Sequence, residues 1–114
     1  MQIIREKITL DELKKMSDKM YNRLVKAVVD VEKQYMVVDV EMHADAEMFM
    51  LEEEESLQEN LWGINIHPEQ QADAFIEFDS LINIRPSQGN RSRGVEDKAM
   101  QKKIRLIVDK CVVK

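Results

Sequence analysis

The chain has 114 residues, a length typical of one globular domain spanning 1–114 with no room for a second. Hydrophobic residues make up 44% of the sequence and charged residues 34%, which supports a packed core and excludes a disordered chain. Apolar runs are only a few residues long and the first residues are charged, so neither a membrane-spanning helix nor a signal peptide is expected. The single cysteine, Cys111, cannot form an internal disulfide, and a reducing cytoplasm is the expected compartment.

The net charge of −5 is distributed unevenly along the chain. Residues 30–83 carry fifteen acids and one base, whereas residues 1–29 and 84–114 have balances of +3 and +6. Such a molecule repels a polyanion unless its bases gather on one face, so nucleic acid is a disfavoured partner. The alternative is that acidic and basic segments lie side by side in the fold and neutralise each other.

The first third of the sequence predicts a strand at residues 3–4, a helix over 10–22 and strands over 24–32 and 36–43. The helix follows from Thr9 and Glu12, which have the spacing of a capping box. The two longer strands follow from their β-branched residues. The short link between them favours an antiparallel hairpin.

The rest of the sequence predicts a short helix or irregular segment over 45–60, strands over 61–67 and 75–85, a loop over 86–95 and a final helix from about 97. Both strands stop at a proline, which cannot continue a ladder. The final helix carries apolar residues on one face and mostly lysines on the other. The order β-α-β-β-(α)-β-β-α predicts an α+β fold: a mixed or antiparallel sheet of about five strands with two long helices packed on one face.

Three of the predicted strands alternate between apolar and polar residues, so each has one polar side. The polar sets are Val37, Asp39, Glu41 and His43, then Gly63, Asn65 and His67, then Glu77, Asp79, Asn83 and Arg85. An antiparallel sheet can present such a face to water without any function. Because the sets are rich in acids, amides and histidine, the face is also a candidate site.

Asp39, Glu41 and His43 are candidate ligands of a divalent metal. On a strand they project from one face at intervals of roughly 7 Å. Two carboxylates and an imidazole suit Mg²⁺, Mn²⁺ or Zn²⁺, with His67 as a further ligand. They form no known metal-binding motif and no nucleophile stands beside either histidine, so the sequence leaves open whether the protein is an enzyme.

Residues 85–94 form an acid-free loop between a predicted strand and a predicted helix N-terminus. The candidate anion donors in this loop are Arg85, Ser87, Asn90, Arg91, Ser92 and Arg93. Free backbone N–H groups and the helix dipole favour an anion at such a position, and arginine binds phosphate or carboxylate bidentately. The glycine spacing differs from that of a Walker loop or a dinucleotide-binding fingerprint. The arginines have a second interpretation, which is pairing with the acidic centre of the chain.

Two further residues have both a functional and a structural interpretation. Trp62, beside Gly63, is a candidate stacking platform for a base or sugar, yet a lone tryptophan in an apolar strand commonly belongs to the core. Cys111 lies on the apolar face of the last predicted helix, where an inert buried thiol is expected.

Three segments resemble a known family: 43–45 (HAD), 61–65 (LWGIN) and 78–92 (FDSLINIRPSQGNRS). Together they resemble a small family of bacterial and archaeal single-domain proteins classed as a domain of unknown function. The resemblance extends over nearly the whole chain. It implies a free-standing cytoplasmic protein and brings no activity, cofactor or catalytic residue.

Two hypotheses of different classes follow from these observations. The first is a cytoplasmic protein that binds a small anionic or phosphorylated ligand through the 85–94 loop, with a divalent metal on the Asp39, Glu41 and His43 side. The alternative is a non-enzymatic module that binds a protein partner or assembles with copies of itself. It would use the polar sheet face and the acidic segment 41–59.

Overall fold

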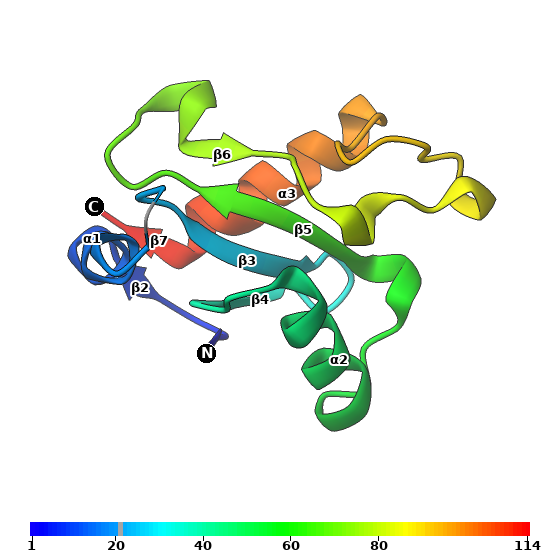
Figure 1. Ribbon diagram of the computed structural model, residues 1–114, viewed down its shortest axis with the longest axis horizontal. Helices are drawn as coiled ribbons and strands as arrows, with labels where there is room; N and C mark the ends of the chain where they lie inside the picture. Colours follow the sequence, from blue (N-terminus) through cyan, green and yellow to red (C-terminus); the bar gives the residue numbers. More distant parts are fainter. Residues whose placement is uncertain (21) are drawn as a thin grey trace.

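A five-stranded antiparallel sheet in the order β1-β4-β3-β5-β6 forms the centre of the computed structural model, which describes residues 1–20 and 22–114 (Figure 1). The strands are β1 (Gln2–Ile4), β3 (Val25–Asp30), β4 (Tyr35–Val38), β5 (Leu61–Ile66) and β6 (Ile76–Glu77). β3 and β4 form the predicted hairpin. A small parallel pair, β2 (Ile8–Thr9) with β7 (Val112–Val113), was not predicted. The α+β class is confirmed.

The helices are α1 (Leu10–Asp18), α2 (His43–Glu53) and α3 (Lys98–Cys111), with 3₁₀ turns η1 (Gln58–Asn60), η2 (Ala72–Phe75), η3 (Leu81–Asn83) and η4 (Pro86–Gln88). The predicted capping box starts α1: Glu12 N donates to Thr9 Oγ1 at 3.1 Å, and Thr9 N donates back to the Glu12 carboxylate. The helix ends at Asp18, and position 21 of the predicted span lies outside the described residues. Among the described helices, none combines the length and the apolar character that a membrane crossing requires.

The helices cover both faces of the sheet (Figure 1). α1 and α3 share one face, as predicted, and build the larger core with residues such as Met16, Ile64 and Ile104. The opposite face, predicted to be rich in polar residues and free of helices, is partly covered by α2. Val37, on the expected polar side of β4, is fully buried beneath α2, because that helix carries Met50 and a second set of core residues.

The predicted strand over 36–43 is too long. β4 ends at Val38 because Asp39 has a left-handed backbone with a φ of 62°, which takes the chain out of the ladder. The chain then enters α2 at His43. Within 45–60, where the sequence left helix and irregular structure open, α2 continues to Glu53 before the irregular chain and η1.

The predicted long strand over 75–85 is also wrong, because only Ile76 and Glu77 pair with β5. Beyond them the side chain of Asn83 takes over the edge of β5. Gly63 N donates to Asn83 Oδ1 at 2.8 Å, and Asn83 Nδ2 donates to Gly63 O at 2.9 Å. The side-chain amide thus satisfies the two backbone groups that a continuing strand would have bonded.

A glycine is required at position 63 because Ser80 packs closely against its backbone, and not because of its backbone angles. A Cβ atom at this position would lie 2.5 Å from both Cβ and Oγ of Ser80, which is buried against the strand. It would also lie 3.2 Å from Cδ2 of His43. The missing side chain is therefore what lets the α2 N-terminus and the segment around Ser80 meet above β5.

We expect Gly63→Ala to destabilise the protein by roughly 1–3 kcal/mol, because the added methyl group forces the backbone near Ser80 to move. Gly94→Ala is the matched control, since its Cβ would meet its nearest atom at 3.4 Å, an ordinary contact. Urea unfolding of both variants measures the difference. Equal stabilities would contradict the packing described here.

Candidate functional site

A cleft of about 580 Å³ lies on the part of the sheet that α2 leaves uncovered. Its lining residues come from β3, β5 and β6, from the N-terminus of α2, from η3 and from Arg93. Both histidines of the chain, His43 and His67, line it. Clefts of this size that gather polar groups from separate segments are typical ligand sites.

Three polar residues cross the floor of the cleft in register. Lys26 of β3 lies opposite Asn65 of β5, which lies opposite Glu77 of β6. No carboxylate of the described residues lies within ion-pair distance of Lys26. The floor therefore presents a cation, an amide and a carboxylate on adjacent strands.

Asn65 is buried, with only 5% of its surface exposed. Its Nδ2 donates to Glu77 Oε1 at 3.1 Å and to Asp79 O at 3.3 Å, which fixes the orientation of the amide. Its Oδ1 finds no donor among the described residues. A buried carbonyl oxygen without a donor is costly, so this atom is a natural contact for an incoming N–H or O–H group.

The two histidines are held by different partners. His67 Nε2 lies 3.1 Å from Glu77 Oε1, so this carboxylate can orient the ring. His43 Nε2 donates to Ile64 O at 2.8 Å, which leaves Nδ1 as the acceptor of a neutral ring. Burial lowers the pKa of His43, so the ring is neutral near pH 7.

The wall of the cleft beyond β6 is formed by residues 79–82 and Arg93. Asp79 and Arg93 pair across it, with Arg93 Nε 2.6 Å from Asp79 Oδ1. Ser80 N donates to Arg93 O at 3.0 Å, and Asn83 Nδ2 donates to the same oxygen at 2.9 Å. These bonds place one of the predicted anion donors, Arg93, at the cleft.

The structure separates the predicted metal ligands. Asp39 Oδ2 lies 3.7 Å from Lys19 Nζ, and Asp39 lines a second hollow, whereas His43 lines the cleft and Glu41 lines both. The expected strand spacing is wrong, because Val38 ends β4 and α2 starts at His43. The described residues contain no group of three or more His, Cys, Asp or Glu side chains arranged to hold a metal ion.

Arg85 and Trp62 pack against each other inside the fold. Arg85 is only 8% exposed, and its guanidinium donates to Gln58 O and Leu61 O. The guanidinium also stacks on the Trp62 ring, with Arg85 Cζ 4.2 Å from the ring centroid. Trp62 is 5% exposed and belongs to the larger core. Trp62 is therefore a core residue, as one of its two interpretations expected. Arg85 binds backbone carbonyls at the N-terminal end of β5.

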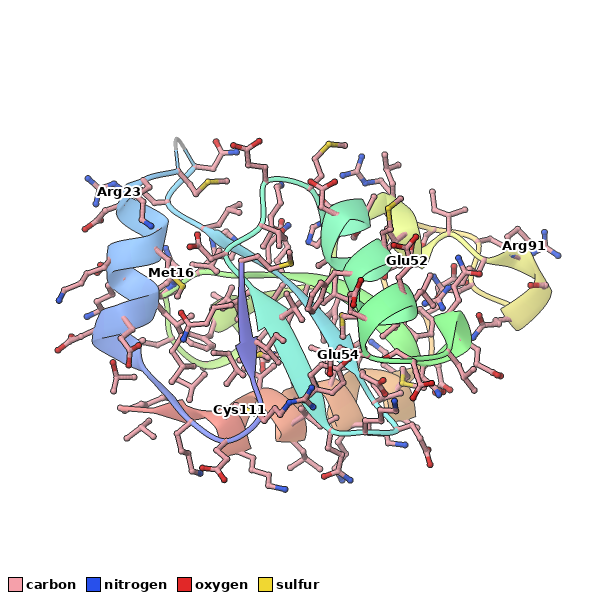
Figure 2. The ribbon with its side chains drawn as sticks, turned by 90° about the horizontal axis from the view of Figure 1, so that it is seen from below. Met16, Arg23, Glu52, Glu54, Arg91 and Cys111 are labelled. Carbon is pink, nitrogen blue, oxygen red and sulfur yellow. The ribbon has the colours of Figure 1, made fainter. Side chains whose placement is uncertain are left out.

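The backbone donors of the 85–94 loop already hold an anion, which is the protein's own Glu96. Arg91 N and Ser92 N donate to Glu96 Oε2 at 2.7 and 2.8 Å, and these bonds lower the pKa of Glu96. Asn90 is buried and fastens the loop, with Nδ2 donating to Asn83 O and Gly94 O. Ser87 is exposed, Arg91 lies at the outer tip of the loop (Figure 2), and neither residue lines the cleft.

Sequence alternation correctly placed Asn65, His67 and Glu77 on one side of the sheet, because β5 and β6 are strands there. It missed Lys26, which also lines the cleft. The available signal was that Lys26 is the one basic residue in the apolar run 24–29. Ser80 and Asn83 were missed as supports of the site because their contacts are distant in sequence.

We expect Arg85→Ala to destabilise the protein by about 2 kcal/mol or more, since two backbone carbonyls lose a charged donor and Trp62 loses its stacking partner. Arg91→Ala, the control in the same loop, is expected to change stability by less than about 0.5 kcal/mol. Denaturant unfolding compares the two. A large loss in the Arg91 variant would show that the loop tip is structural.

The lowered pKa of His43 makes stability depend on pH. Below about pH 6.5 the unfolded chain binds a proton at His43 more readily than the folded chain does, so stability falls as the pH drops further. The His43→Gln variant keeps a donor for Ile64 O and lacks the titration. We expect its stability to fall less than that of the wild type between about pH 7 and pH 5. Parallel pH profiles of the two proteins would refute this account.

A comparison with protein families matches residues 2–111 to the family described as "Protein of unknown function (DUF5674)". Searches of curated proteins and of solved structures each gave no significant match. The family match includes the cleft and all of the loop residues discussed above, and its description assigns no activity. The chain belongs to the DUF5674 family.

Proposed function

We propose that the protein binds a small anionic ligand, a carboxylate or a phosphate ester, in the cleft on the uncovered half of the sheet. The observation that supports this proposal most strongly is the in-register row of Lys26, Asn65 and Glu77. Residues far apart in the sequence converge there on one surface, beside both histidines.

The charges around the cleft favour an anion at one position. Of the three acids that line the cleft, Glu77 contacts His67 and Asn65, and Asp79 is paired with Arg93. Glu41 has no cation within ion-pair distance among the described residues. Lys26 is half-buried and has no carboxylate within ion-pair distance among the described residues. A carboxylate or phosphate that contacts Lys26 would supply the missing counter-charge.

The ligand should also carry a hydrogen-bond donor and an apolar part. A donor would satisfy Asn65 Oδ1, which has no partner among the described residues. Leu24, Met42 and Leu81 add apolar surface to the lining. The volume of about 580 Å³ lies within the range of small-molecule sites.

In this proposal the 85–94 loop contributes mainly through Arg93, which lines the cleft. Arg85 binds backbone carbonyls, and the loop's backbone N–H groups at positions 91 and 92 bind Glu96. A divalent metal remains part of the proposal because Glu41 and His43 lie at the cleft and both can contribute to a ligand set completed by the bound anion.

The test is thermal unfolding against small organic acids, sugar phosphates and nucleotides, each with and without Mg²⁺ or Mn²⁺, at constant ionic strength. A ligand at about 100 times its dissociation constant adds roughly 2.7 kcal/mol and should raise the midpoint by several degrees. We expect Lys26→Met to abolish the shift given by the ligand found in this way.

Two control variants locate the site. Lys102→Met removes the same charge from an exposed position on α3 and should leave the shift unchanged. Arg91→Ala removes the arginine at the loop tip and should also leave it unchanged. A shift that survives Lys26→Met but disappears with Arg91→Ala would place the ligand on the loop and overturn the cleft assignment.

A further inference from the structure

α2 differs from the other two helices in what it presents to solvent. α1 and α3 expose mainly charged residues, whereas the outer side of α2 carries Ala44, Met48 and Leu51 at helical spacing. Met48 is 60% exposed and Leu51 36%. Because the inner side of α2 is apolar as well, the helix is hydrophobic on two sides and only one of them is covered.

This apolar surface extends beyond α2. η3 packs against the helix and carries Leu81, which is 66% exposed. Met42, at the N-terminus of α2, is 60% exposed and lines the same cleft as Ala44 and Leu81. We call Met42, Ala44, Met48, Leu51 and Leu81 the methionine patch. Contiguous exposed apolar surfaces of this kind are typical of interaction sites.

The methionine patch is bordered by acids. Asp45 and Glu52 are exposed and lie seven residues apart on α2, on the side next to Met48 by helical spacing, and Glu52 is labelled on the helix in Figure 2. Glu41 and Glu55 lie just beyond the two ends of α2. The helix contains no lysine or arginine. An approaching surface must therefore combine apolar side chains with positive charge.

We propose that the methionine patch binds a basic amphipathic helix of a partner protein. Leucine-like residues on one face of such a helix would pack on Met48 and Leu51, while its lysines or arginines would meet Asp45 and Glu52. Methionine side chains adapt readily to the shape of a partner. The acidic border repels a nucleic acid or an anionic membrane, which excludes these occupants on charge.

A second copy of the chain fits this surface poorly. Its most basic helix is α3, whose apolar face, including Ile104 and Val108, is buried in its own core. The exposed side of α3 offers basic residues and Leu106 as its one large apolar side chain. None of the described helices presents a full apolar face together with positive charge, so the fitting partner is another chain. This proposal does not rest on ligand binding in the cleft.

The test uses a synthetic helix of about 18 residues with leucines along one face and lysines on the other, titrated against the full protein by calorimetry. Two control peptides separate the contributions. One replaces each lysine with glutamate, and the other has the same composition in an order without helical periodicity. We expect binding of the first peptide only.

A matched pair of variants locates the contact on the protein. Met48→Lys and Leu106→Lys each place one lysine at a helix position that is 60% exposed in the wild type, so they change net charge equally. Met48→Lys should weaken binding at least tenfold, and Leu106→Lys less than twofold. Circular dichroism and thermal unfolding verify that both variants fold.

Several results would overturn the proposal. If the two variants weaken peptide binding equally, the interaction is a long-range attraction between charges and not a contact with the methionine patch. Binding of the non-periodic peptide would also show that attraction between charges, and not an apolar helix face, holds the peptide. Sedimentation that shows a dimer of the free protein, dissociated by Met48→Lys, would assign the patch to a second copy. No binding of the Leu/Lys helix would refute a basic amphipathic partner.

Discussion

The pairing of the Asn83 side chain with Gly63 is the interaction on which the half of the molecule that carries the cleft depends. An exposed strand edge leaves its N–H and C=O groups without partners, and these groups usually pair with another strand. A carboxamide presents a donor and an acceptor side by side, as a peptide group does. Asn83, which is fully buried, therefore satisfies the edge of β5 at Gly63. The chain after β6 can then leave the sheet.

The departure of the chain from the sheet after β6 creates the cleft. If β6 continued in register, Asp79 would pair with Gly63 and the strand would run along β5. Instead the chain turns at Ser80, which packs on the bare Gly63 backbone and bonds Arg93 O. Asn90 fastens the returning loop to Asn83 in the same manner, by side-chain amide to backbone. Asp79 and Arg93 are thereby held beside Asn65 and both histidines, although they lie outside the sheet.

The sequence predicted the elements whose signals are local. The capping box at Thr9, the amphipathic pattern of α3 and the β-branched run of β3 each determine structure within a few residues. The ends of β4 and β6 depend on a left-handed Asp39 and on a bond between Asn83 and Gly63, and neither has a local pattern. The same limit applies to the site: alternation placed Asn65 and His67 together, but could not show that Arg85 is buried on Trp62.

The charge pattern is resolved only in part by pairing within the fold. Arg5, Lys19 and Arg93 of the basic ends pair with acids of the central segment, yet Asp45 and Glu52 on α2 have no such partner among the described residues. Acidic α2 and basic α3 lie on opposite faces of the sheet, so the molecule presents faces of opposite sign. Lys26 lies in the cleft with Arg93 and, among the described residues, has no carboxylate within ion-pair distance. Under the proposed function, a small anion that contacts Lys26 would meet only the carboxylates that line the cleft, whereas a polyanion would meet the whole acidic face.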